Sequence, residues 1–140
     1  MRVINFDRFF VENEKFEIYN EIEEKNGVIL KHHPELFLLA CTLGYQYSIK
    51  KELSSKKGLV RKQSILNVEF DNIKYGELIY EAFKYIALQE EKFDQEGNLL
   101  VNKLMEEYAN AGIEKLKKEI FNKSAKKEEI LVNFIMLNID

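Results

Sequence analysis

The chain has 140 residues, which is long enough for one globular domain with its own core. Hydrophobic residues make up 46% and charged residues 32%, a composition that excludes an intrinsically disordered chain. The net charge of −3 argues against a protein that coats nucleic acid with its whole surface. The longest dense apolar run, LFLLACTL at 36–43, is far shorter than the roughly 20 residues of a membrane span. We therefore expect a single soluble domain over residues 1–140, with no membrane contact.

The first third of the chain predicts a strand and two helices. Residues 2–10 are apolar and aromatic with little helical period, which indicates a short strand or an extended arm. A helix is expected over 13–25, with Asn13 as its N-cap. The next helix begins near Pro34 and runs to about Lys51, and because it is apolar on most sides we expect it to form the core.

The remaining elements are helices that follow a less regular segment at 52–72. Within that segment, LVRKQSILNVEF at 59–70 has β-branched residues without a helical period and predicts a short β-hairpin or an extended arm. Helices are then expected at about 73–92, capped by Asp71-Asn72, at 98–121, and at 125–138, capped by Ser124. The predicted fold is mainly α, a compact bundle of about five helices.

Two of these helices carry informative patterns. The helix at 73–92 has one apolar face, made of Tyr75, Leu78, Ile79, Ala82, Phe83 and Ile86. The helix at 98–121 has a patch of small residues at Ala109, Ala111 and Gly112. A glycine inside a helix costs about 1 kcal/mol relative to alanine, so this patch indicates close packing of another element.

No residue pattern indicates catalysis or a cofactor. His32-His33 is the only histidine cluster, and it lacks the further ligands that zinc requires. Cys41 lies among apolar residues and is expected to pack in the core, and a lone cysteine fits a reducing cytoplasm. The glycines form no phosphate-binding motif. We expect a cytoplasmic protein that is not an enzyme and has neither metal nor cofactor.

The charge reverses locally between residues 50 and 62. Six positive charges stand there against the single acid Glu52, and they are Lys50, Lys51, Lys56, Lys57, Arg61 and Lys62. Such a cluster is a candidate for binding nucleic-acid phosphates. Lys50 and Lys51 also suit the end of the core helix, where cations favour the helix dipole, and solvation in a loop explains the other four. Both interpretations stay open.

Three stretches resemble one known family. They are ELFLLACTLGYQYSIKKEL (35–53), YEAFKYIALQE (80–90) and MEEYANAGIEKLKKEI (105–120). The last is similar to the segment EEYANGGLEIL of the Dnd-system-associated protein 4 family, also called DNA phosphorothioation-associated protein 4, with Ala111 in place of a glycine. The motif residues, which we expect to be structural, are Gly44, Tyr45, Glu107, Tyr108, Ala109, Asn110 and Gly112.

The resemblance implies a small, mainly helical accessory protein of bacterial phage-defence systems that place sulphur in the DNA backbone. It implies no catalytic residues. Our leading hypothesis is a non-enzymatic accessory subunit that binds other proteins of the same system, with self-association as a further option. The acidic stretch at 7–24 and the basic stretch at 50–62 favour oriented docking. The alternatives are a DNA-binding module that uses the basic segment, and an enzyme for which the sequence offers no residues.

Overall fold

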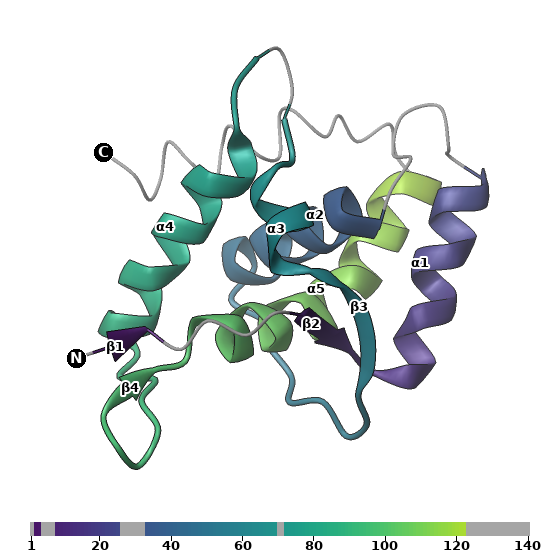
Figure 1. The fold of residues 1–140 in the computed structure, drawn as a ribbon. Helices are drawn as coiled ribbons and strands as arrows, with labels where there is room; N and C mark the ends of the chain where they lie inside the picture. The colour runs from purple at the N-terminus through teal and green to yellow at the C-terminus, as the bar shows by residue number, and fades with distance from the viewer. Residues whose placement is uncertain (1, 4–7, 26–32, 70–71, 123–140) are drawn as a thin grey trace.

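The computed structural model describes residues 2–3, 8–25, 33–69 and 72–122. Figure 1 shows the elements, which are β1 (Arg2–Val3), β2 (Arg8–Val11), α1 (Asn13–Lys25), α2 (His33–Gln46), β3 (Lys57–Arg61), α3 (Lys62–Leu66), α4 (Tyr75–Gln89), β4 (Asn98–Leu99) and α5 (Val101–Asn122). The predicted mainly α fold with a small β component is confirmed. The helix predicted at 125–138, with its cap Ser124, lies outside the described residues.

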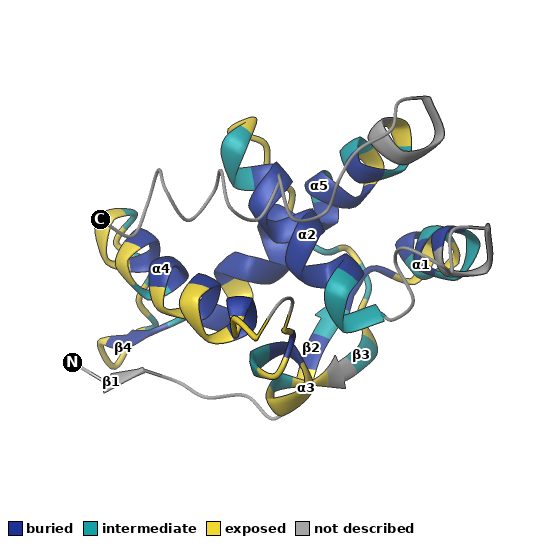
Figure 2. Cartoon of the chain, turned by 90° about the horizontal axis from the view of Figure 1, so that it is seen from above, coloured by how far each residue is buried: buried dark blue, intermediate teal, exposed yellow. Residues whose placement is uncertain are grey.

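Helix α2 is the centre of the molecule. Every residue from Leu36 to Gly44 is buried, as expected for a helix that is apolar on most sides. Figure 2 shows α2 in dark blue, surrounded by α1, α4, α5 and the strands. Its most extensive contact is with α5. The prediction of a core helix is confirmed, and the α2–α5 pair is the framework on which the other elements pack.

The C-terminal end of α2 differs from the prediction. The helix ends at Gln46 rather than near Lys51, because Ser48 adopts a left-handed φ of 55°. The N–H of Ile49 then bonds to the carbonyl of Gly44 at 2.8 Å, and that of Ser48 to the carbonyl of Tyr45 at 3.0 Å. This is a Schellman motif, which satisfies the last helical carbonyls and turns the chain away. Lys50 and Lys51 therefore follow the helix, and the interpretation that they lie in its last turn is wrong.

The strands join segments that are distant in sequence. Strand β2 pairs antiparallel with β3, and β1 pairs parallel with β4. In β2, Phe9 and Val11 are buried, so this face of the strand packs on the core and the opposite face is outward. Strand β3 covers the first part of the region expected to be extended, and its pairing partner comes from the N-terminal part of the chain. The residues after β3 form the short helix α3, which the sequence pattern did not predict.

Helix α4 begins later than predicted and buries most of its apolar face. The N-cap position belongs to Lys74, so Asn72, which has a φ of 65°, does not cap the helix, and Asp71 lies outside the described residues. Leu78 is 36% exposed and does not belong to the buried face. The other predicted members of that face are buried, namely Tyr75, Ile79, Ala82, Phe83 and Ile86.

Candidate functional site

The first residues of the basic segment lie against α5 and the end of α4. The Lys50 Nζ forms an ion pair with the Glu90 carboxylate at 2.5 Å and lies 5.4 Å from the centre of the Tyr108 ring. Lys51 is exposed, and its backbone N–H bonds to the carbonyl of Glu107 at 3.0 Å. The charge of Lys50 is thus matched within the protein, and the backbone of Lys51 holds the segment on α5.

The next two lysines lie beside aromatic rings. The Lys56 Nζ is 5.9 Å from the centre of the Phe10 ring, and the Lys57 Nζ is 4.0 Å from that of Phe16 on α1. Cation–π contacts of this kind are worth about 0.5–1 kcal/mol at exposed sites. The two side chains therefore fix the chain around β3 on β2 and α1, while both residues remain exposed.

Arg61 faces a second arginine that sequence reasoning missed. In the β2–β3 sheet, Arg8 pairs directly with Arg61, and both side chains are exposed. Arg8 belongs to the acidic stretch at 7–24, outside the predicted basic cluster. The pairing of residues so far apart in the chain comes from the tertiary fold, and no local signal in the sequence could have identified it.

Lys62 continues this positive surface onto α3 and α4. Its Nζ lies 4.5 Å from the centre of the Tyr80 ring, and the Lys84 Nζ lies 5.6 Å from the same ring. Burial, together with the neighbouring charge of Lys84, lowers the pKa of Lys62, and Glu81 acts in the opposite direction. Lys84 also forms an ion pair with Glu81 at 2.9 Å. The structure thus separates the predicted cluster, since Lys50 lies near Glu90 while Arg61 and Lys62 lie at the sheet and α3. DNA binding by the whole segment stays a prediction.

The small residues of the family motif lie where α2 and α5 cross. A Cβ atom on Gly44 would come within 2.2 Å of the carbonyl oxygen of Tyr108, and one on Gly112 within 1.8 Å of the carbonyl oxygen of Ala40. Ala109 is buried. The two backbones therefore touch directly, which agrees with the close packing that the small-residue patch predicts.

The polar residues of the motif hold distant segments on α5. The Asn110 amide donates to the carbonyls of Lys51 at 3.1 Å and Glu52 at 3.2 Å. The Tyr108 hydroxyl donates to the Glu90 carboxylate. The pKa of Tyr108 is raised well above its ordinary value, mainly by burial and to a smaller extent by this hydrogen bond. The Tyr45 ring meets the Tyr108 ring edge-on, with centres 5.5 Å apart. These contacts explain the motif residues as supports for the basic segment.

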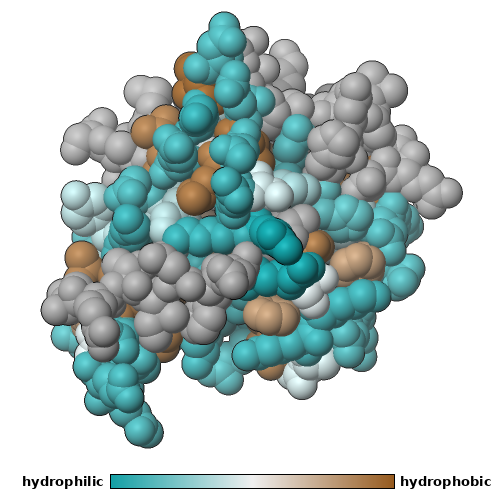
Figure 3. All heavy atoms as spheres, in the orientation of Figure 1, coloured by the Kyte–Doolittle hydropathy of each residue, from teal (hydrophilic) through white to brown (hydrophobic). Residues whose placement is uncertain are grey.

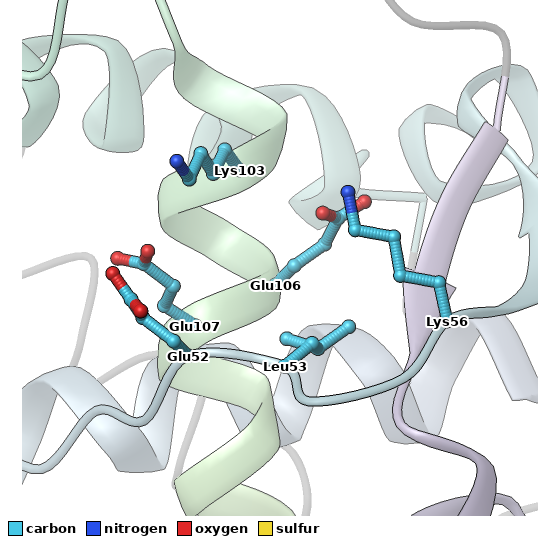
Figure 4. Close-up of a pocket in the computed structure, with 6 residues that line it drawn as sticks. All are labelled: Glu52, Leu53, Lys56, Lys103, Glu106 and Glu107. Carbon is cyan, nitrogen blue, oxygen red and sulfur yellow. The ribbon is translucent and has the colours of Figure 1, made fainter.

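A pocket of about 190 Å³ opens between the basic segment and α5. Its lining consists of Glu52, Leu53, Lys56, Lys103, Glu106 and Glu107, and Figure 4 shows the Glu52 and Glu107 carboxylates together at one end. Glu106 accepts the N–H of Phe10 at 2.8 Å, which fastens β2 to α5. Burial raises its pKa to about 7, although this bond and the nearby Lys56 lower it in part.

The cysteine and the described histidine that were considered for chemistry both contact other residues of the fold. Cys41 is buried, its Sγ contacts the carbonyl of Met105 at 3.2 Å, and burial raises the pKa of the thiol, all of which oppose a nucleophilic role. His33 contacts Asn20 at 3.1 Å, and His32 lies outside the described residues. Among the residues described, no group of three or more His, Cys, Asp or Glu side chains is placed to hold a metal ion.

None of the described helices combines the length and the apolar character that crossing a membrane requires.

Comparison with known proteins identifies one family. The model of the family described as DNA sulphur modification system-associated protein 4 matches residues 8–139. No curated protein and no solved structure matches the chain. Because the match extends over nearly the whole sequence and agrees with the motif residues described above, the chain belongs to the DNA sulphur modification system-associated protein 4 family.

Proposed function

We propose that this protein is a non-enzymatic accessory subunit of a DNA sulphur modification system and that it acts by binding another protein of that system. The association with a DNA sulphur modification system rests on membership of the family. A row of apolar side chains on the outer side of α4 supports the protein contact. The surroundings of Cys41, which is buried and has a raised pKa, argue against one enzymatic role, that of a nucleophilic cysteine.

The outer row of α4 consists of Leu78, Tyr85 and Leu88, which are 36%, 65% and 36% exposed. These positions are spaced by seven and three residues and so lie on one side of the helix over about three turns. Brown, apolar atoms come to the surface in the region of α4 in Figure 3. Exposed apolar residues are usually scattered singly, so a row on one helix marks an interaction surface.

The spacing of the row fits a specific mode of binding. An amphipathic helix that offers anchors at such intervals lies in an apolar groove of its partner. Glu81 lies on the same side of the helix, three residues after Leu78 and four before Tyr85, and its ion pair with Lys84 adds polar groups to this surface. Tyr85 is the most exposed of the three and has the side-chain type that most often dominates binding energy, so we assign it the central anchor position.

The experiment is reconstitution of the complex. The protein is co-expressed with each of the other proteins encoded by the same system, and complexes are measured by size-exclusion chromatography and calorimetry. Tyr85→Ser with Leu78→Ser should weaken the complex about 30-fold or more, since an anchor residue is worth about 2 kcal/mol or more.

Tyr47→Ser is the matched control, because Tyr47 is 50% exposed but lies beyond the end of α2. It should leave the affinity unchanged. Absence of a complex with every protein of the system, or equal affinity for the α4 variant and the wild type, would contradict the proposal. A change in the oligomeric state of the isolated protein caused by the α4 variant would instead identify a second copy as the occupant.

A further inference from the structure

We propose that the outer face of the β2–β3 sheet, together with the adjoining edge of α3 and α4, binds the phosphate backbone of duplex nucleic acid. This basic face is defined by Arg8, Arg61, Lys62 and Lys84. It goes beyond the protein contact proposed above, and of its four residues only Lys84 also adjoins that contact. It also differs from the basic segment at 50–62, because it adds two cations that lie far away in sequence and leaves out Lys50, whose charge Glu90 matches.

The first observation is the direct pairing of two arginines across the sheet. Arg8 and Arg61 occupy paired positions, and the register of the sheet shifts between this pair and the next one, Phe10 with Gly58. Phe9 on β2 is fully buried, so the alternation of the strand directs Arg8 outward. Like charges placed opposite one another destabilise a sheet. An anion bound on this face would screen the two charges from each other and reduce that cost.

The second observation is the room that β3 leaves for one of these arginines. The Arg8 Cδ lies 2.6 Å from the place where a Cβ atom of residue 58 would be, and residue 58 is glycine. The side chain therefore lies along β3, in space that a side chain at residue 58 would share with it. Glycine at this position leaves room for the Arg8 guanidinium on the outer face of the sheet.

The third observation is a pair of ammonium groups over one aromatic ring. Lys62 and Lys84 come from different elements and both lie over Tyr80. The charge of Lys84 helps to lower the pKa of Lys62, because the two ammonium groups repel each other. A phosphate bound beside these two lysines would stabilise both ammonium groups in their charged form. Glu81, which forms an ion pair with Lys84, limits the attraction at this edge.

The two arginines of the basic face differ from several lysines of the protein in their carboxylate partners. Lys15, Lys50 and Lys117 form ion pairs with Glu114, Glu90 and Glu21. Within the described residues, Arg8 and Arg61 form no ion pair. Figure 3 shows the most hydrophilic atoms, in the darkest teal, near the centre of the view over β3 and α3. The protein as a whole has a net charge of −3, so this concentration of positive charge is local.

The chemistry of the four cations favours phosphate. Guanidinium groups form paired hydrogen bonds with phosphate oxygens, and lysines bind phosphate as point charges. Arginine and lysine side chains grouped on one face suit contacts to the DNA backbone, which are independent of sequence. We therefore expect weak binding that does not depend on base sequence and falls steeply with salt.

The test is fluorescence anisotropy of a labelled DNA duplex with the full chain, over a salt series from about 50 to about 200 mM. Arg8→Glu with Arg61→Glu should weaken binding about 100-fold, if each charged contact is worth about 1.4 kcal/mol. The slope of log affinity against log salt should become shallower by about 2, one unit for each lost phosphate contact. Arg8→Lys with Arg61→Lys keeps the charges and should retain most of the affinity.

The control is Lys117→Glu with Lys118→Glu, which changes the net charge by the same amount near the far end of α5. The double variant Arg8→Glu with Arg61→Glu should be about as stable as the wild type, because two glutamates repel each other across the sheet as two arginines do. A loss of binding in this variant is therefore not expected to come from unfolding. Arg8→Glu alone sharpens the test, since it places opposite charges across the sheet and should keep or raise the melting temperature while it weakens DNA binding.

Two results would overturn the proposal. One is no duplex binding at low salt, and the other is an equal loss of binding in the Lys117 and Lys118 control. If the duplex does not bind but the Arg8 and Arg61 reversal abolishes the complex with a protein of the system, the basic face binds an acidic protein surface instead. The α4 variant is expected to bind DNA normally, so failure of this proposal and failure of the proposed protein contact can be distinguished.

Discussion

Two sides of α5 meet the rest of the protein in different ways. On the side that faces α2, Ala109 and Gly112 have little or no side chain, and the helix backbones touch. On the other side, Glu106 and Asn110 are buried polar residues that bind the backbone of β2 and of the basic segment. Packing on the first side requires small side chains that let the two helices approach closely. Packing on the second side depends on hydrogen bonds between segments that are distant in sequence. The family motif therefore contains two kinds of constraint within about two turns of helix.

The change with the largest expected effect adds one methyl group to the packing side. Gly112→Ala places a Cβ atom within 1.8 Å of the carbonyl oxygen of Ala40. We expect the free energy of unfolding to fall by about 3 kcal/mol, because α2 is buried and cannot move away without disrupting the core. Helix propensity alone predicts a gain of about 1 kcal/mol, so the two explanations differ in sign. Urea denaturation measures the difference, and a variant more stable than the wild type would show that the helices do not cross this closely.

The second change tests the buried carboxyl group on the polar side. Glu106 has a pKa of about 7 against an ordinary value of 4.5. Since the folded pKa is the higher one, the folded protein binds the proton more tightly, and stability is lost as the pH rises from about 4.5 to about 7. Glu106→Gln cannot ionise and should be more stable than the wild type by about 2 kcal/mol at pH 8, with little difference near pH 4.5.

Glu114 provides the matched control for Glu106. Its hydrogen bond with Lys15 lowers its pKa, so its contribution to stability is present at neutral pH and lost as the pH falls. Glu114→Gln should therefore destabilise the protein at pH 7, by an amount that shrinks in acid. Thermal unfolding over a range of pH compares the two variants. A Glu106 variant whose advantage does not change with pH would exclude ionisation of this residue as the cause.

The smallest expected effect concerns the support of the basic segment. Asn110→Ala removes the amide that donates to the carbonyls of Lys51 and Glu52. We expect a loss of about 1 kcal/mol, because these carbonyls lie near the surface and water replaces part of the interaction. Hydrogen exchange should become faster around residues 50–53 and remain unchanged in α4. Uniform acceleration over the whole protein would indicate that Asn110 supports the core rather than this segment.

Prediction from sequence succeeded where the signal is local. The bounds of α1 and the central place of α2 follow from apolar residues at helical spacing and from the position of Pro34. The close contact at Gly112 was expected for a similar reason, since a glycine inside a helix needs an explanation in packing. The end of α2 was predicted too late. Ser48 adopts a left-handed conformation, which glycine adopts most readily. Because position 48 is a serine, the sequence does not indicate that the helix ends there.

Composition and periodicity by themselves determined that this is a mainly helical domain, that its second helix is the core and that positive charge is concentrated near residue 60. Only the tertiary structure decided which charges meet. Arg8 lies opposite Arg61, Lys84 lies beside Lys62, and Lys50 is matched by Glu90, because strand pairing and helix packing join residues that are far apart in the chain. Helical periodicity is a local property and can be read from neighbouring residues. An interaction surface depends on contacts across the fold, and these exist only once the chain has packed.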